Sequence, residues 1–267
     1  MEIKLVAVDL DDTLLNSRQE IGEECYKAVE ELKSKGVIVV LATGRMFRAA
    51  LPYAEKLGLD MPLIAYQGAL VKKPGSNRVL YCQNLENEMA LEVMRFLDEA
   101  DVYYHIYADD NLYVDKITRE VDFYIESGIE PLPVGKLIFF ADNRNITEIM
   151  ASVHDEKRLL KIAAGLRENF GDKLHISYLK NRYIEIMHKK ANKGEALKFI
   201  CNYYGINREE VMAIGDGYND IPMLKWAGVG VAMENAPKEV KKAADFITFS
   251  SDENGVAYAL KKFILKD

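Results

Sequence analysis

Short apolar runs that stop abruptly at polar residues alternate with segments of helical periodicity in the first and last parts of the chain. Such runs are typical of strands that are buried on both faces of a parallel sheet. They occupy Ile3–Val8, Val37–Leu41, Pro62–Tyr66, Val211–Ile214, Gly228–Met233 and Asp245–Thr248. Apolar residues recur at helical spacing before Gly36 and Gly58, over Lys193–Tyr204 with Gly205 after it, and over Lys238–Ala244. The alternation predicts an open, doubly wound α/β sheet.

The middle of the chain has a different texture, because apolar and polar residues alternate there and polar turns join the stretches. This pattern predicts two β-hairpins. Their strands are Tyr103–Ala108 with Leu112–Asp115 across Asp109-Asp110-Asn111, and Leu174–Leu179 with Tyr183–Met187 across Lys180-Asn181-Arg182. Lys136–Ala141 is predicted to be a fifth strand, and helices are predicted over Glu86–Glu99, Thr118–Ser127 and Thr147–Phe170. An α+β domain over residues 84–187 is therefore expected inside a core formed by residues 1–83 and 188–267.

Composition narrows the class of protein. With 267 residues, of which 49% are hydrophobic, the chain can bury a substantial core. A net charge of −7 and the lack of any Lys/Arg run argue against a nucleic-acid partner. Cys25, Cys82 and Cys201 are odd in number and far apart, so free thiols are expected. No basic leader or membrane-length apolar run is present, which predicts a cytoplasmic protein with no membrane partner and no obligate protein partner.

Four polar clusters are candidates for one site, because doubly wound sheets bind their ligands beyond the carboxyl ends of their strands. They are Asp9–Thr13, Thr43–Arg45, Lys193 and Asp216–Asp220. Asp9, Asp11 and Asp12 place three carboxylates within four residues, and a hard cation such as Mg²⁺ offsets charges that are so crowded. Each cluster by itself would also fit an ordinary turn or helix cap.

The other clusters carry groups that suit a bound phosphate. Thr43-Gly44-Arg45 offers a hydroxyl, a flexible backbone and a guanidinium to an oxyanion. Lys193 is the first residue of a predicted helix, where a positive charge interacts unfavourably with the helix dipole. A phosphate bound there would explain the presence of a lysine at this position. Asp216-Gly217-Tyr218-Asn219-Asp220 adds further oxygen ligands after another buried strand.

Taken in order, the segments DLDDT, ATGR, NKG and GDGYND resemble the four motifs of the haloacid dehalogenase superfamily. The insertion between the second and third motifs is similar to the cap of the Cof-type, subclass IIB, sugar-phosphate phosphatases, and so is the VAMENA segment Val231–Ala236. The resemblance implies a doubly wound, Rossmann-like parallel-sheet core with an inserted α+β cap that sets substrate specificity. Asp12 stands where glycine is frequent in the family, and Gln67 stands where the subgroup usually has asparagine.

The resemblance also implies a function: magnesium-dependent hydrolysis of small phosphate monoesters, with sugar phosphates first and pyridoxal phosphate or flavin mononucleotide as alternatives. Asp9 would form an aspartyl-phosphate, and Asp11 would act as acid and then as base. Asp9, Asp216 and the backbone carbonyl of Asp11 would hold Mg²⁺. The residues expected to bind phosphate or substrate are Thr43, Gly44, Arg45, Lys193 and Asn219, with Asp220 orienting Lys193. For Arg45, a structural ion pair is an equal alternative.

Other readings of the same motifs remain open from the sequence. A phosphomutase or phosphotransferase would share the aspartyl chemistry. A haloacid dehalogenase needs neither the metal ligands nor an acid at Asp11. A receiver-like phosphorylation switch, which is not an enzyme, also combines aspartates, a lysine and magnesium, but its nucleophile follows a later strand than Asp9 does.

Histidines and tyrosines in the insert carry a weaker signal. The four histidines show no spacing suited to a metal, so packed or surface positions are expected for them. Tyr103, Tyr104, Tyr107 and Tyr113 would suit a sugar-facing surface, but cross-strand packing is the favoured interpretation.

Overall fold

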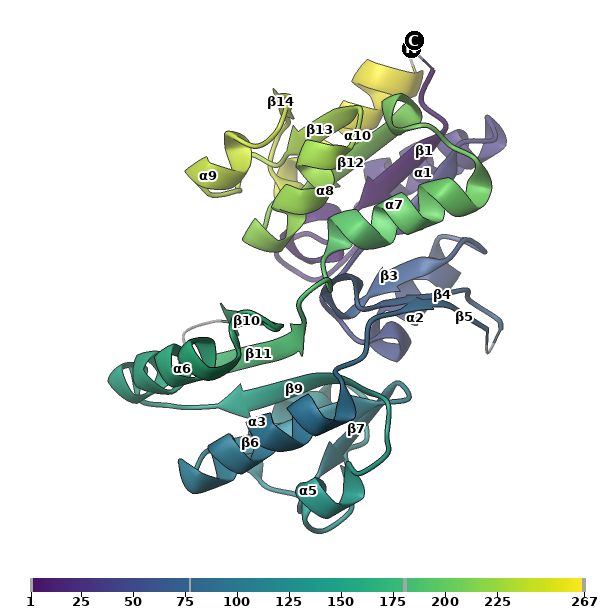
Figure 1. Ribbon diagram of the computed structural model, residues 1–267. Helices are drawn as coiled ribbons and strands as arrows, with labels where there is room; N and C mark the ends of the chain where they lie inside the picture. The colour runs from purple at the N-terminus through teal and green to yellow at the C-terminus, as the bar shows by residue number, and fades with distance from the viewer. Residues whose placement is uncertain (1, 77, 180–181, 266–267) are drawn as a thin grey trace. The chain divides into compact units, whose positions relative to one another are not determined.

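The computed structural model describes residues 2–76, 78–179 and 182–265. The chain divides into two compact units (Figure 1): unit 1 comprises Met1–Tyr81 and Asn192–Asp267, and unit 2 comprises Cys82–Ala191. The sequence predicted boundaries after residues 83 and 187. None of the helices in the described residues has the length and apolar character needed to cross a bilayer.

Unit 1 is built on a five-stranded parallel sheet in the order β14-β13-β12-β1-β2. The strands are β1 (Leu5–Val8), β2 (Ile38–Leu41), β12 (Val211–Gly215), β13 (Val229–Ala232) and β14 (Phe246–Ile247). Every residue of β1 and β12 is buried, which explains why these strands read as continuous apolar runs. The predicted open α/β sheet is confirmed.

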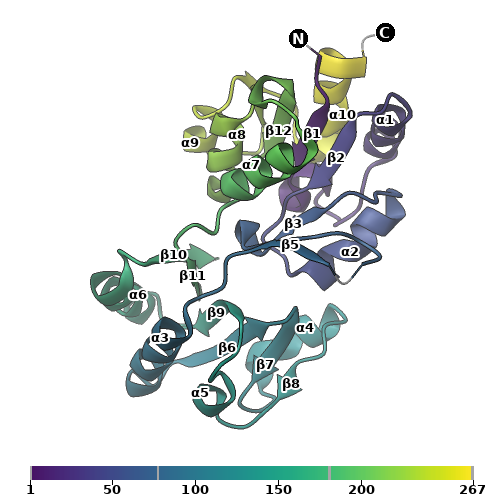
Figure 2. The ribbon, with the colours of Figure 1, turned by 45° about the vertical axis from the view of Figure 1, so that its right-hand side comes forward.

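Helices cover both faces of this sheet (Figure 2). α7 and α8 pack with Leu5 and Ala7 on one face, while α1 and α10 lie on the other. The helices of this unit beside the parallel sheet are α1 (Glu23–Ser34), α7 (Lys193–Tyr204), α8 (Ile221–Trp226), α9 (Lys238–Lys241) and α10 (Gly255–Leu260). The Asn192 side chain caps α7 by accepting from the Glu195 amide at 2.9 Å, and Gly205, with φ of 66°, ends it.

The predicted strand Pro62–Tyr66 exists as β3 (Leu63–Ala65), but it belongs to another sheet. It lies in a three-stranded sheet with β4 (Leu70–Lys72) and β5 (Val79–Cys82), next to α2 (Phe47–Lys56). One parallel bridge, between Ala42 and Ile64, joins it to the end of β2. The sequence did not predict β4 and β5, because one is only three residues long and the other has no buried residue to create a pattern.

Unit 2 contains a six-stranded sheet in the order β10-β11-β9-β6-β7-β8. Its strands are β6 (Tyr103–Ala108), β7 (Asn111–Val114), β8 (Leu132–Pro133), β9 (Ile146–Ser152), β10 (Leu174–Leu179) and β11 (Tyr183–His188). Both predicted hairpins are confirmed. Asp109 and Asp110 have φ of 51° and 58°, the left-handed conformation that a tight hairpin turn of this kind requires. The other expected turn, at Lys180-Asn181, lies outside the described residues.

One face of the unit 2 sheet packs against two long helices (Figure 1). The helices of this unit are α3 (Asn87–Glu99), α4 (Asp122–Glu126), α5 (Leu137–Phe140) and α6 (Glu156–Phe170). Apolar residues from α3 and α6 pack with Tyr104, Ile106, Ile149 and Ile184 of the sheet in a core that belongs to this unit alone. The predicted helix Glu86–Glu99 corresponds to α3.

Two predictions for unit 2 are wrong. The predicted strand Lys136–Ala141 is instead helix α5 over Leu137–Phe140. A short apolar run has no period that could distinguish a strand from a helix. At the start of this helix the Leu137 amide donates to the Asp115 carboxylate at 2.7 Å. The predicted helix Thr147–Phe170 is helical only over α6, since its first part is strand β9. That strand pairs with both β6 and β11, and pairing partners so distant in sequence leave no local signal.

Candidate active site

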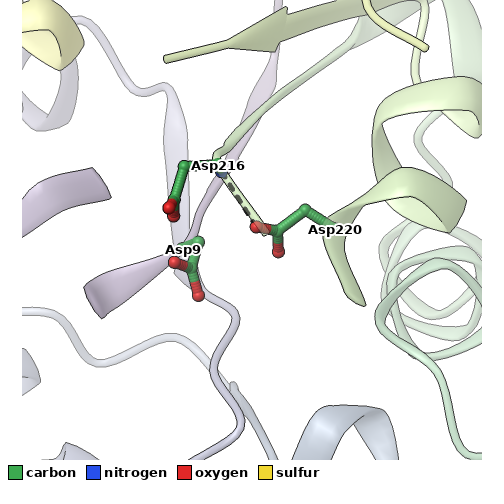
Figure 3. A group of neighbouring side chains, drawn as sticks. All are labelled: Asp9, Asp216 and Asp220. Atoms are coloured by element: carbon green, nitrogen blue, oxygen red, sulfur yellow. Dashed lines mark hydrogen bonds between the residues drawn. The ribbon is translucent and has the colours of Figure 1, made fainter. Parts of the chain in front are cut away.

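The predicted polar clusters all lie in unit 1: those at Asp9, Thr43 and Asp216 follow the carboxyl ends of core strands, and Lys193 opens α7. Asp9 follows β1 and Asp216 follows β12, and these strands are parallel neighbours. The Asp9 amide donates to the Ile214 carbonyl at 3.0 Å, which holds the two strand ends together. Figure 3 shows the carboxylates of Asp9 and Asp216 side by side, with Asp220 next to them. One carboxylate oxygen of each lies within 4.8 Å of the others.

Lys193 is the cation of this cluster. Its side chain is completely buried, and Nζ donates to Oδ1 of Asp9 at 2.5 Å and to Oδ1 of Asp220 at 2.6 Å. Burial acts to lower the pKa of Lys193, but the charges of Asp220 and Asp9 outweigh it and raise that pKa above its ordinary value. A charged lysine at the start of α7 is therefore held by the carboxylates.

Asp220 uses both of its oxygens inside the protein. While Oδ1 accepts from Lys193, Oδ2 accepts from the backbone amides of Asp216 at 3.0 Å and Gly217 at 2.8 Å. These contacts fix the loop that carries Asp216 and leave little capacity for a metal ion. Asp220 is thus arranged to position its neighbours.

The charges of the cluster suit a divalent cation. Asp9, Asp216 and Asp220 carry three negative charges against the one positive charge of Lys193, which leaves −2. Burial, reinforced by Asp220, raises the pKa of Asp9 well above its usual range, and burial raises the pKa of Asp216 to about 6. A hard cation removes this repulsion, and the donors are all oxygen atoms. The residues present fit Mg²⁺.

Thr13 supports the carboxylate of Asp216 and was not assigned a role from the sequence. Its hydroxyl donates to Oδ1 of Asp216 at 2.8 Å and is buried. The turn Leu10–Leu14 brings it there, and Asp12 within that turn has φ of 56°. This left-handed conformation explains why glycine is frequent at that position in the family. The sequence signal for a role of Thr13 was its position as the last residue of the DLDDT motif.

Asp11 stands apart from the three clustered carboxylates. Its two oxygens accept from Arg45, at 2.5 Å from Nη2 and 2.9 Å from Nε. Arg45 also donates to the Tyr53 hydroxyl at 3.1 Å and to Oε1 of Gln19 at 2.6 Å. The structure thus shows Arg45 in an ion pair. The role of Asp11 as a metal ligand, through its backbone carbonyl, stays a prediction.

The expected phosphate-binding groups offer unused donors. The Thr43 hydroxyl oxygen accepts from the Arg45 amide at 3.0 Å, and no acceptor for its proton lies among the described residues. No described group accepts from the Gly44 amide. The Asn219 side-chain amide instead donates to Oε1 of Gln67 at 2.6 Å. Gln67 therefore belongs to this neighbourhood, and its place before Gly68-Ala69 was the only sequence signal for it.

Gly68 lets the backbone pass close to the start of α7. Its φ is 101°, and an added Cβ would lie 2.3 Å from the Asn192 carbonyl oxygen and 2.8 Å from the Lys193 amide nitrogen. We expect Gly68→Ala to lower the free energy of unfolding by more than about 2 kcal/mol and to reduce activity, because the helix carrying Lys193 must shift. Denaturant unfolding and steady-state assays measure both effects.

Gly36→Ala is the matched control. Gly36 also has a positive φ, of 76°, but an added Cβ would meet nothing within 4 Å. Gly36→Ala should lower the free energy of unfolding only by the conformational strain, about 1 to 2 kcal/mol, and should leave activity unchanged. Equal losses in the two variants would show that the close approach at Gly68 is unimportant.

The sequence matches the family of haloacid dehalogenase-like hydrolases over residues 6–260. It is 32% identical over 265 residues to the 5-amino-6-(5-phospho-D-ribitylamino)uracil phosphatase YcsE of Bacillus subtilis, covering 99% of this chain and 97% of that protein. The structure of TM0651 from Thermotoga maritima aligns with a TM-score of 0.89 and 31% identity, over 99% and 98% of the two chains. The HAD subclass IIB sugar phosphatase BT4131 aligns with a TM-score of 0.82 and 26% identity, over 97% and 98%.

Fold, site and relatives together define a phosphatase of the haloacid dehalogenase type. The chain belongs to the haloacid dehalogenase-like hydrolase family, in its Cof-type, subclass IIB branch. The resemblance seen in the four motifs is confirmed, and so is the predicted enzyme class.

Proposed function

We propose that this phosphatase hydrolyses small phosphate monoesters with Mg²⁺, through a phosphoryl group carried by Asp9. The observation that carries the proposal is the pairing of a buried Asp9, at the end of β1, with a fully buried Lys193. A carboxylate held by a lysine beside unused hydroxyl and amide donors suits attack on a phosphoryl group.

In the first step, an Asp9 carboxylate oxygen forms a bond to phosphorus while the bond between phosphorus and the ester oxygen breaks. Asp11, as a carboxylic acid, gives its proton to the departing alcohol oxygen. Lys193, the Thr43 hydroxyl and the Gly44 amide hold the oxygens of the phosphoryl group. Asp11 must release at least one of its contacts with Arg45 to act in this way.

In the second step, Asp11 is a carboxylate and accepts a proton from the attacking water. The bond between phosphorus and Asp9 breaks, which returns the Asp9 carboxylate and releases inorganic phosphate. Asp220 keeps Lys193 in place throughout, since its Oδ1 accepts a hydrogen bond from the same ammonium that contacts Asp9.

Asp9, Asp216 and the Asp11 carbonyl would hold Mg²⁺, which when bound neutralises charge on the phosphoryl oxygens. Asp9 and Asp216 each keep one carboxylate oxygen that has no partner among the described residues. Oxygen donors that remain available in an otherwise occupied cluster support this assignment.

For the substrate, we propose a sugar phosphate or a related phosphorylated metabolite, recognised in part by unit 2 as a cap domain. The names of two relatives support this class, since one is a sugar phosphatase and the other acts on a phosphorylated ribityl compound. A panel of phosphate monoesters assayed for released phosphate, with Mg²⁺ and with chelator, tests the proposal. Turnover that survives complete chelation would contradict it.

Asp216→Ala should weaken the response to magnesium. The substitution removes a carboxylate that only Thr13 engages in the described structure, and we expect the Mg²⁺ concentration for half-maximal activity to rise by about 100-fold or more. A titration of phosphate release against Mg²⁺ measures it. Asp60→Ala, at a side chain that is 84% exposed, is the control and should titrate like the wild type. An unchanged titration for Asp216→Ala would assign the metal to other ligands.

A further inference from the structure

Met233–Ala236, the second part of the VAMENA segment, has no role in the proposed reaction. It follows β13 directly and belongs to unit 1. The Met233 amide donates to the Gly215 carbonyl at 3.1 Å, and Gly215 is the residue before Asp216. The segment therefore contacts one of the two stretches of chain that carry the proposed metal ligands.

Asn235 gives the segment a contact with the other stretch. Its Nδ2 donates to the Asp12 carbonyl oxygen at 2.8 Å, and its Oδ1 accepts from the Ser251 amide at 3.1 Å. An amide nitrogen donates and an amide oxygen accepts, so these two partners fix the orientation of the carboxamide. Asn235 is exposed, yet both ends of its side chain are engaged with backbone groups. It thus ties the turn Leu10–Leu14 to the loop at Ser251.

The carbonyl that Asn235 contacts belongs to the strained residue of this turn. Asp12 has φ of 56° and ψ of 10°, whereas Asp11 before it is extended, with φ of −72° and ψ of 131°. The left-handed conformation is unfavourable for a residue with a side chain. The direction of the Asp12 carbonyl is set by ψ of Asp12, so a donor held at 2.8 Å favours this ψ over others. Asn235 therefore stabilises a backbone conformation that Asp12 adopts less readily by itself.

The conformation of Asp12 decides how its two neighbours in the turn are placed. The carbonyl of Asp11, a proposed ligand of Mg²⁺, precedes it. Thr13 follows it, and the Thr13 hydroxyl donates to Oδ1 of Asp216 at 2.8 Å. Because Asp11 and Thr13 are joined through Asp12, a rotation about its φ or ψ moves one relative to the other. Contacts that orient metal ligands from outside contribute to the affinity of a metal site.

We infer that Asn235 is a positioning residue for Mg²⁺: it holds the turn in the conformation in which the Asp11 carbonyl can act as a ligand beside the carboxylates. The same segment also contacts the strand end before Asp216, so one short stretch of chain orders both sides of the site. A purely structural role would let Asn235 contribute to the free energy of unfolding without affecting metal affinity. The inference rests on the proposed function, in which these groups hold Mg²⁺.

Two substitutions of Asn235 test the inference in the full-length protein. Asn235→Ala removes both contacts, whereas Asn235→Asp keeps an acceptor for the Ser251 amide and turns an oxygen toward the Asp12 carbonyl in place of the donor. We expect the dissociation constant for Mg²⁺, measured by titration calorimetry, to rise about 10-fold or more in both variants. The charge added in Asn235→Asp would by itself strengthen the binding of a cation, so weaker binding in this variant reports the lost hydrogen bond.

Asn202→Ala and Asn202→Asp are the matched controls. They make the same chemical changes at an exposed residue of α7, and they should bind Mg²⁺ like the wild type. Hydrogen exchange without metal is a second measurement that needs no turnover. The peptide covering residues 9–15 should exchange faster in both Asn235 variants, because the turn opens more often, and at the wild-type rate in both controls.

Hydrolysis of p-nitrophenyl phosphate by the wild type separates this inference from the proposed function. If the wild type hydrolyses the ester with Mg²⁺ and all variants share its Mg²⁺ dissociation constant, the inference is overturned and the proposed function stands. If the wild type binds Mg²⁺ but releases no phosphate, the proposed function fails, and the difference in affinity between the Asn235 and Asn202 variants still decides the role of Asn235. Asn235 variants that lose stability in urea but keep wild-type Mg²⁺ affinity and exchange would also overturn the inference.

Discussion

Replacing Asp9 with asparagine is expected to abolish phosphate release, with a loss on the order of 10⁴-fold or more in kcat. The amide has nearly the same shape but is a poor nucleophile, so no phosphoryl group can be carried at this position. Acid-quenched single turnovers with ³²P-labelled substrate should give labelled wild-type protein and no label on the variant. Fragment mass spectrometry should locate the label at Asp9.

The fold of the Asp9→Asn variant should be intact, because Lys193 keeps its contact with Asp220 and one of three crowded carboxylates is removed. Without metal its thermal midpoint should equal or exceed that of the wild type. Asp12→Asn is the matched control, since Asp12 is exposed in the same turn and asparagine tolerates its φ of 56°. A folded Asp9→Asn protein with near-wild-type turnover would falsify the assignment of the nucleophile.

Lys193→Met is expected to damage both stability and activity. It leaves Asp9 and Asp220 buried without a cation, and breaking a buried ion pair in this way costs about 3 to 5 kcal/mol. Activity should fall as well, because the phosphoryl oxygens lose their buried positive charge. Urea unfolding in chelator at pH 8 measures the stability. The loss should shrink as pH falls, because protonation removes the unpaired buried charges.

Lys198→Met tests the same chemical change on the same helix. Its side chain is 40% exposed and pairs with Glu195 at the surface, so we expect the free energy of unfolding to change by no more than about 0.5 kcal/mol. Saturating Mg²⁺ should restore part of the stability of Lys193→Met, since a divalent ion supplies the missing charge. If Lys193→Met were as stable as Lys198→Met at pH 8 in chelator, the charge balance described here would be wrong.

Local patterns in the sequence were sufficient for most elements of unit 1. The run Ile3–Val8 predicted β1, and Lys193–Tyr204 with its glycine predicted α7 residue for residue. These predictions held because the parallel sheet buries both faces of each strand, which leaves a continuous apolar run. The first hairpin of unit 2 was predictable for a related reason, since its turn residues Asp109 and Asp110 adopt the left-handed conformation that short polar residues favour.

The errors fall where a short segment depends on pairing partners that its own residues do not indicate. Strand β9 pairs with β6 and β11, and Thr147–Phe170 alone gives no sign of either. Likewise, β3 has an apolar run like those of the core strands, but its pairing with β4 puts it in another sheet. In both cases tertiary contacts decide between alternatives that local propensity leaves nearly equal in free energy.

The sequence by itself determined the family and which polar clusters come together, because clusters that follow the strands of a doubly wound sheet converge at one edge. Only the tertiary structure decided how these groups pair. It joins Lys193 to both Asp9 and Asp220, and it turns Asp11 toward Arg45. It also buries Glu148 of unit 2 with one carboxylate oxygen, Oε1, that has no hydrogen-bond partner in the described part of the chain. Hydrogen bonds and burial depend on distances between remote residues, and no local pattern of side chains encodes those distances.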